Sequence, residues 1–130
     1  MNKFTSKLFV DHIVLTVSNI TKSKKFYSKI FGTPDGSDKC SCWFKIDKTK
    51  IFLATPYGKM PKKDRFNPNR IGLEHWAIGV SNLSKLRQIE DNLTTKKIKH
   101  SGIHIDKHSK LEKIWLDDPD GMRIEFFLRK

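Results

Sequence analysis

The stretch GLEHWAIGVSN, residues 72–82, decides the interpretation of this chain, because a related stretch occurs earlier in it. A shift of 63 positions aligns DHIVLTVSNITKSKKF, residues 11–26, with EHWAIGVSNLSKLRQI, residues 74–89. His12 then matches His75, and each histidine follows an acidic residue at the start of an alternating apolar pattern typical of a strand. A repeat of this length indicates an internal duplication.

Both copies predict the same order of elements. A strand is expected at about residues 9–17 and again at about 75–80, and each is followed by an asparagine, Asn19 or Asn82, that suits the N-cap of a helix. Apolar residues at helical spacing follow, and Gly32 suits the end of the first helix. Further strands are expected in CWFKID, KIFLAT, LEKIWLDD and MRIEFFL, with short strands near residues 33–38 and 98–106.

These elements predict an α+β fold built from two βαβββ modules. The first module is expected at about residues 8–55, the linker at 56–72 and the second module at 73–130, all within a single domain. The linker contains three prolines and lacks hydrophobic periodicity.

Alternation along the predicted strands places His12, His75 and Glu125 on faces opposite the bulkier apolar residues. Two imidazoles and one carboxylate form a 2-His-1-carboxylate set, which leaves coordination positions open for water and substrate. The alternative is that both histidines are structural residues and that Glu125 pairs with Arg123. The duplication favours the metal site.

Composition limits the choice of partner. The net charge is +12, but 21 of the 26 basic residues are scattered lysines and no nucleic-acid-binding motif is present, so a nucleic-acid partner is not expected. No apolar run is long enough to span a bilayer and no signal peptide is recognised, so a cytoplasmic protein without a membrane partner is expected. Cys40 and Cys42 are interpreted as reduced thiols.

DHIVLTVSNITKSKKFYSKIFG, GLEHWAIGVSN and WLDDPDGMRIEFF resemble, in this order, motifs of the vicinal oxygen chelate superfamily, which includes glyoxalase I, bleomycin resistance proteins and extradiol dioxygenases. The resemblance implies paired βαβββ modules around a metal-centred cavity, with ligands at His12, His75 and Glu125. It implies Fe2+, Mn2+, Ni2+ or Zn2+ as cofactor. Glyoxalase I carries a fourth ligand, a glutamate, where this chain has Phe52, so a typical four-ligand glyoxalase I is not expected.

The resemblance further implies a metal-dependent enzyme that chelates the neighbouring oxygens of a small substrate, with Glu125 as the catalytic ligand. The reaction would be of the lyase, isomerase, thiol-addition or dioxygenase type. The substrate pocket is predicted to contain aromatic residues and one arginine, which suit an anionic or aromatic molecule: Trp43, Phe52, Trp115, Arg123 and Phe127. Ordinary core packing is the alternative for each aromatic residue.

Two further questions stay open from the sequence. Phe52 is also compatible with a non-catalytic binding protein of the bleomycin-resistance type, which needs no metal. His100, His104 and His108 are candidates for an acid or base, with solvated loop histidines as the alternative. A homodimer is expected, because relatives build the cavity across two chains.

Overall fold

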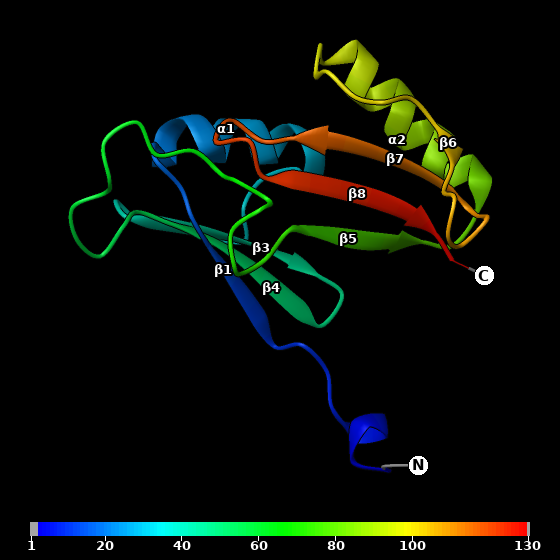
Figure 1. Cartoon of the computed structure of the whole chain (residues 1–130), viewed down its shortest axis with the longest axis horizontal. Helices are drawn as coiled ribbons and strands as arrows, with labels where there is room; N and C mark the ends of the chain where they lie inside the picture. The colour runs from blue at the N-terminus through cyan, green and yellow to red at the C-terminus, as the bar shows by residue number, and fades with distance from the viewer. Residues whose placement is uncertain (1–2, 130) are drawn as a thin grey trace. The chain divides into compact units, whose positions relative to one another are not determined.

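The computed structural model describes residues 3–129, which divide into two compact units, the first ending at Lys62 and the second beginning at Lys63. The elements of the first unit are η1 (Lys3–Lys7), β1 (His12–Thr16), α1 (Ile20–Phe31), β2 (Gly36–Ser37), β3 (Ser41–Ile46) and β4 (Thr49–Ala54). Those of the second unit are β5 (His75–Val80), α2 (Leu83–Thr95), β6 (His104–Ile105), β7 (Glu112–Asp117) and β8 (Arg123–Leu128). Both units therefore have the predicted order βαβββ (Figure 1).

Each unit contains one four-stranded mixed sheet with the same topology. The strand order is β1-β4-β3-β2 in the first unit and β5-β8-β7-β6 in the second. The first and last long strands of each unit pair in parallel, and the remaining pairs are antiparallel. The predicted paired βαβββ fold is confirmed.

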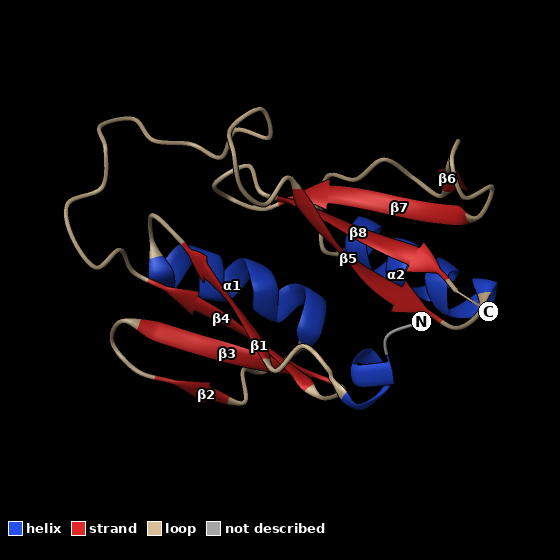
Figure 2. Cartoon of the chain, turned by 60° about the horizontal axis from the view of Figure 1, so that its bottom comes forward, coloured by secondary structure: helices blue, strands red, loops and turns tan. Residues whose placement is uncertain are grey.

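Each helix covers one face of its own sheet (Figure 2). Asn19 and Asn82 cap the two helices as predicted, because their side chains accept hydrogen bonds from the backbone N–H groups of Lys22 and Lys85. Gly32 ends α1 with a positive φ of 85°, a conformation that favours glycine.

The core of each unit lies between helix and sheet. Leu15, Tyr27, Phe44 and Leu53 are buried in the first unit. The second unit buries a larger apolar set under α2: Trp76, Leu86, Leu93, Ile114, Leu116, Ile124 and Phe126. The opposite face of each sheet carries the histidine, as the alternation predicts.

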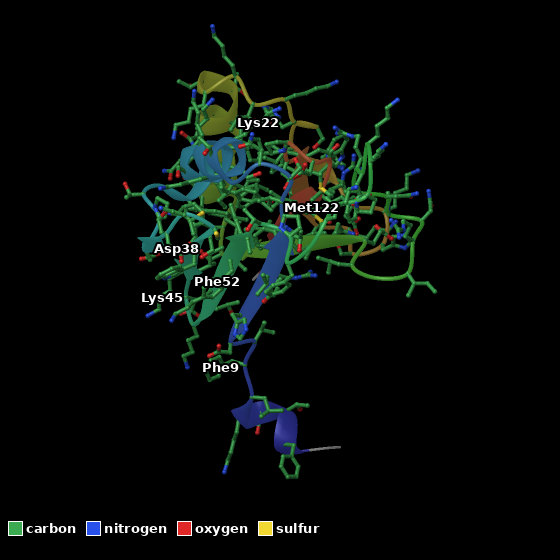
Figure 3. All side chains as sticks on the ribbon, turned by 90° about the vertical axis from the view of Figure 1, so that its left-hand side faces the viewer. Phe9, Lys22, Asp38, Lys45, Phe52 and Met122 are labelled. Carbon is green, nitrogen blue, oxygen red and sulfur yellow. The ribbon has the colours of Figure 1, made fainter. Side chains whose placement is uncertain are left out.

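The first strand is shorter than expected. It begins at His12 rather than near residue 9, because its partner β4 begins at Thr49 and Lys50 is the residue that pairs with His12. Phe9 and Val10 precede the ladder and are exposed (Phe9 is labelled in Figure 3). Phe9 and Val10 continue the apolar pattern of the sequence, but they lie before the residues of β1 that pair with β4.

Among residues 3–129, no helix is both long enough and apolar enough to cross a membrane. Residues 55–72 contain neither helix nor strand.

Candidate metal centre

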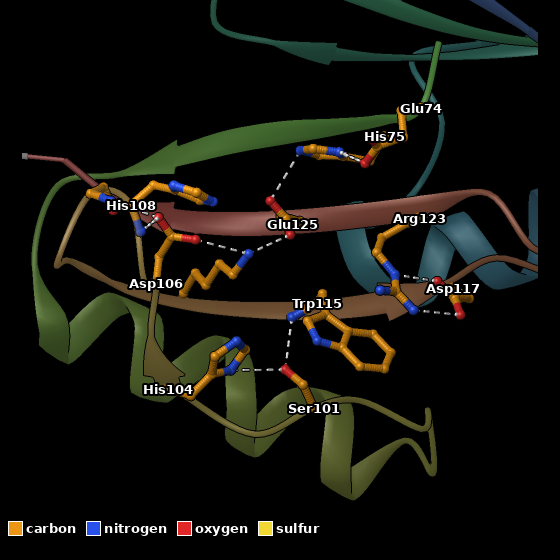
Figure 4. Close-up of polar contacts among 12 residues, drawn as sticks. Glu74, His75, Ser101, His104, Asp106, His108, Trp115, Asp117, Arg123 and Glu125 are labelled. Atoms are coloured by element: carbon orange, nitrogen blue, oxygen red, sulfur yellow. Dashed lines mark hydrogen bonds and ion pairs between the residues drawn. The ribbon is translucent and has the colours of Figure 1, made fainter. Parts of the chain in front are cut away.

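His75 and Glu125 meet on the face of the second sheet that α2 does not cover, which is its open face. β5 and β8 run in parallel with Ala77 opposite Glu125, so the histidine lies two residues before the position that faces the glutamate. The Nε2 atom of His75 is 3.2 Å from Oε2 of Glu125. The glutamate side chain is 7% exposed and the histidine 39%, so the carboxylate is buried while the imidazole reaches solvent (Figure 4).

Both candidate ligand histidines are oriented by the acidic residue that precedes them. Nδ1 of His12 lies 2.7 Å from Oδ2 of Asp11, and Nδ1 of His75 lies 2.9 Å from Oε1 of Glu74. Histidines that bind metals usually donate their second ring N–H to a carboxylate or carbonyl in this way. In each unit Nδ1 faces the acidic side chain, and in the second unit Nε2 of His75 faces Glu125.

The donor set therefore suits a divalent metal ion. Imidazole and carboxylate ligands bind Fe2+, Mn2+, Ni2+ and Zn2+ alike. Within residues 3–129, His75 and Glu125 stand as a pair, and no group of three or more His, Cys, Asp or Glu side chains is gathered in one place. Because His12 belongs to the first unit, the ligand set of His12, His75 and Glu125 stays a prediction.

A lysine that the sequence analysis did not select occupies the other side of Glu125. Lys113, on β7, places Nζ 2.9 Å from Oε1 of Glu125 and 3.2 Å from Oδ1 of Asp106. The hydrogen bond to Glu125 raises the pKa of Lys113 above its usual value, and the contact with Asp106 adds to this effect. The buried carboxylate is therefore paired with an ammonium group.

Asp106 is itself held by the turn that precedes β7. Its Oδ2 accepts hydrogen bonds from the backbone N–H groups of Ser109, at 2.8 Å, and His108, at 3.2 Å. The Ser109 N–H is the main reason that the pKa of Asp106 lies well below its usual range, and Lys113 lowers it further.

A signal for Lys113 was present in the sequence, since it lies two residues before Trp115 on the same side of a predicted strand.

Arg123 does not pair with Glu125, which was the pairing expected if the site were purely structural. It pairs with Asp117, with Nε 2.9 Å from Oδ1, and its guanidinium lies 3.7 Å from the ring centre of Trp115. Glu125 pairs with Lys113 instead, so this part of the alternative to the metal site is wrong. Because β7 and β8 pair Asp117 with Arg123, this aspartate is directly opposite the arginine across the ladder.

The predicted pocket residues of the second unit lie on the same face as Glu125. Trp115 is its cross-strand partner on β7, and Phe127 lies two residues further along β8. Both aromatic residues are half-buried, and the guanidinium of Arg129 lies 4.7 Å from the ring centre of Phe127. This face presents aromatic surface beside a charged cluster.

The open face of the first sheet is aromatic instead. Phe52 lies between His12, at 5.8 Å in an edge-on arrangement, and Trp43, at 5.4 Å, where distances join ring centres. Phe52 and Lys45 are labelled on the strands of this unit in Figure 3. The Trp43 ring lies over Gly36, where an added Cβ would come within 1.8 Å of the ring, so this approach requires glycine.

Two of the three loop histidines have structural partners. His100 accepts the backbone N–H of Gly102 at Nδ1 and contacts the Thr94 hydroxyl at Nε2. His104 places Nδ1 3.0 Å from the carbonyl oxygen of Gly102. These contacts hold the segment that joins α2 to β6. Both histidines are half-buried and His104 begins β6, so neither is the solvated loop residue of the alternative, and the acid or base role stays a prediction.

The thiols lie away from the open face. Cys42 is buried on β3 beside the helix-facing core, where burial raises the pKa of its thiol, and Cys40 is exposed before the strand. Both cysteines are free, as predicted.

Comparison with known proteins agrees with this architecture. The chain is 30% identical over 124 residues to the trivalent organoarsenical cleaving enzyme of Bacillus sp. strain MD1, covering 92% of this chain and 72% of that protein. A glyoxylase/bleomycin resistance protein/dioxygenase domain from Frankia sp. EAN1pec aligns with a TM-score of 0.76 at 20% identity, over 95% of this chain and 93% of that one. Lactoylglutathione lyase from Agrobacterium tumefaciens aligns with a TM-score of 0.71 at 13% identity, over 94% and 93%.

The sequence profile of one superfamily matches residues 9–126, which include both histidines and Glu125. Together with the paired βαβββ units, this match shows that the chain belongs to the glyoxalase/bleomycin resistance protein/dioxygenase superfamily.

Proposed function

We propose that this protein is a metal-dependent enzyme that acts on a small substrate with neighbouring oxygen atoms. His12, His75 and Glu125 would hold the divalent ion. The observation that carries the proposal is the shared arrangement of the histidines, each with Nδ1 bound to the preceding carboxylate and Nε2 left as a donor. In the second unit, Nε2 of His75 already faces a carboxylate oxygen.

When bound, a divalent ion of this kind supplies Lewis-acid stabilisation for negative charge on substrate oxygens. The protein residues supply position and surroundings. Glu74 and Asp11 keep the imidazoles oriented, and the buried side chain of Glu125 offers a carboxylate of fixed position. Trp115 and Phe127 give the second sheet an apolar wall that suits a flat substrate.

The substrate class favoured here is an oxygen chelator rather than an arsenical. The Bacillus relative is named for cleavage of trivalent organoarsenicals, and trivalent arsenic binds thiols strongly. Cys42, one of the two thiols of this chain, is buried on the helix side of its sheet. A trivalent organoarsenical is nevertheless included in the substrate panel below.

Metal titration of the purified, metal-free protein tests the proposal. Wild type should bind one divalent ion per chain, and His12→Gln, His75→Gln and Glu125→Gln should each lose most of that affinity. His108→Gln is the matched control, since its exposed side chain lies outside the predicted ligand set. A wild-type protein that binds no Fe2+, Mn2+, Ni2+ or Zn2+ would refute the proposal.

Turnover separates an enzyme from a binding protein. A panel of compounds with two neighbouring oxygens, with the arsenical as one further member, would be assayed with wild type and Glu125→Gln. An enzyme should lose turnover in this variant, while a metal-independent binder should keep its affinity. The alternative of a non-catalytic small-molecule-binding protein is supported by Phe52 and Trp43, which make the first sheet's face apolar.

We also propose a cytoplasmic homodimer without nucleic-acid or membrane partners. The scattered lysines support the absence of a nucleic-acid partner, because the chain lacks the arginine-rich pattern of nucleic-acid recognition. Sedimentation at several protein concentrations tests the dimer, and a monomer throughout would contradict it.

A further inference from the structure

We propose that Lys113 is a positioning residue for the metal-binding carboxylate, holding one oxygen of Glu125 so that the other alone is offered to the ion. The inference rests on the proposed function. It concerns how Glu125 binds, which that proposal leaves open.

The two oxygens of Glu125 have different neighbours. Oε1 lies 2.9 Å from Nζ of Lys113, while Oε2 lies 3.2 Å from Nε2 of His75 (Figure 4). Lys113 is on β7 and His75 on β5, so the carboxylate on β8 is approached from both neighbouring strands. One oxygen is engaged by a cation, and the other faces a metal-donor atom.

Lys113 is held in place from more than one side. Its Nζ also contacts Oδ1 of Asp106 at 3.2 Å and lies 5.7 Å from the ring centre of Phe127. Its side chain is 18% exposed. An ammonium group has three donors, and the two carboxylates use two of them. A lysine held in this way fixes its partner's orientation, which a solvated surface lysine does not.

The consequence is a carboxylate that coordinates through a single oxygen. A glutamate with both oxygens free can take two coordination positions on one ion. With Oε1 engaged by Lys113, Glu125 takes only one coordination position. The position that Oε1 would have filled stays open for a substrate oxygen. Bidentate chelation of a substrate needs two such open positions.

Cobalt substitution tests this inference directly. Metal-free wild type, Lys113→Met, Lys113→Arg and Lys99→Met would each be loaded with Co2+, whose visible absorption depends on the number and type of its ligands. Lys113→Met should show a spectrum shifted from that of wild type, because the released carboxylate oxygen replaces a water on the ion. Lys113→Arg keeps a cation beside Glu125 and should resemble wild type. Lys99→Met is the matched control, because it removes one lysine charge from an exposed site in the same unit.

The outcomes distinguish the two proposals. A wild type that binds Co2+, together with a Lys113→Met spectrum identical to it, would overturn the positioning role alone. A wild type that binds no Co2+ would overturn the proposed function and this inference with it. If Lys113→Met does not fold, Lys113→Gln takes its place with the same expected spectral shift, because its shorter amide carries no charge.

Discussion

In the first unit Phe52 lies opposite Val14 on β1 and Trp43 on β3; in the second, Glu125 lies opposite Ala77 on β5 and Trp115 on β7. The backbone pairing is the same, so Phe52 and Glu125 occupy equivalent places. One is packed between two aromatic rings, and the other is held between an imidazole and an ammonium.

The two units also differ at one position of the strand next to Phe52 or Glu125, which is β3 in the first unit and β7 in the second. Lys113 lies two residues before Trp115, and Ser41 lies two residues before Trp43. The unit with the carboxylate has the lysine, and the unit with phenylalanine has a short hydroxyl side chain. A buried charge needs a partner of opposite charge, whereas an aromatic ring needs only apolar contacts. The two copies thus share the fold, and only the second has the charged pair.

The largest expected effect comes from making the second unit resemble the first at this position. Glu125→Phe removes the proposed carboxylate ligand and leaves Lys113 partly buried without its nearest partner. We expect metal affinity to fall by more than the about 10–100-fold typical of losing an outer-shell partner. Calorimetric titration with Mn2+ measures this. Phe127→Leu, on the same strand and face, is the control, and equal affinity in both variants would contradict the role of Glu125.

The reverse change in the first unit should reduce stability. Phe52→Glu places a carboxylate between aromatic rings without an ammonium beside it, and we expect a loss of about 1–3 kcal/mol in the free energy of unfolding. Adding Ser41→Lys supplies the missing cation and should recover part of that loss. Urea denaturation of both variants provides the measurement. No recovery in the double variant would show that Ser41 and Lys113 are not interchangeable positions.

Helix caps should behave alike in both units. Asn19 and Asn82 each accept a hydrogen bond from the backbone N–H three residues on, at 2.9 Å and 2.8 Å. Alanine at either position should cost about 1 kcal/mol of the free energy of unfolding. Thermal and chemical denaturation of the two variants would show the effect. A cost confined to one of them would mean that the equivalence of the two caps is not energetic.

The smallest effect concerns acid. Asp106 precedes β7 in the second unit, and Asp38 precedes β3 in the first. Backbone N–H groups lower the pKa of each carboxyl. A carboxyl whose pKa is lower in the folded protein stabilises it above about pH 4, its unfolded value, and this contribution is lost as the pH falls. Asp106→Asn and Asp38→Asn should therefore each flatten the loss of stability below pH 4. Denaturation midpoints at several pH values measure the slope, and an unchanged slope would refute the assignment.

The fold was predictable because the duplication repeats the strand pattern and the helix N-cap. Asn19 and Asn82 begin helices in both copies, and the alternation around His12 and His75 identifies the open faces. The length of β1 was less predictable, because the start of β4 rather than the apolar pattern sets where pairing begins.

The candidate site was predictable only in part. His75 and Glu125 follow from strand alternation, and the structure brings them together. The choice of Lys113 over Arg123 as the partner of Glu125 depends on the register between β7 and β8 and on Asp117, which lies opposite the arginine. Register between strands is a tertiary property that periodicity along one strand does not contain.

The pairing of Lys113 with Glu125 also bears on the order in which such a protein is assembled. A structural zinc site contributes its binding energy to folding, so the chain without metal is unfolded. Here the buried carboxylate already has a cation at 2.9 Å, so its charge is compensated without an ion. If the proposed function holds, folding and metal loading would be separate events.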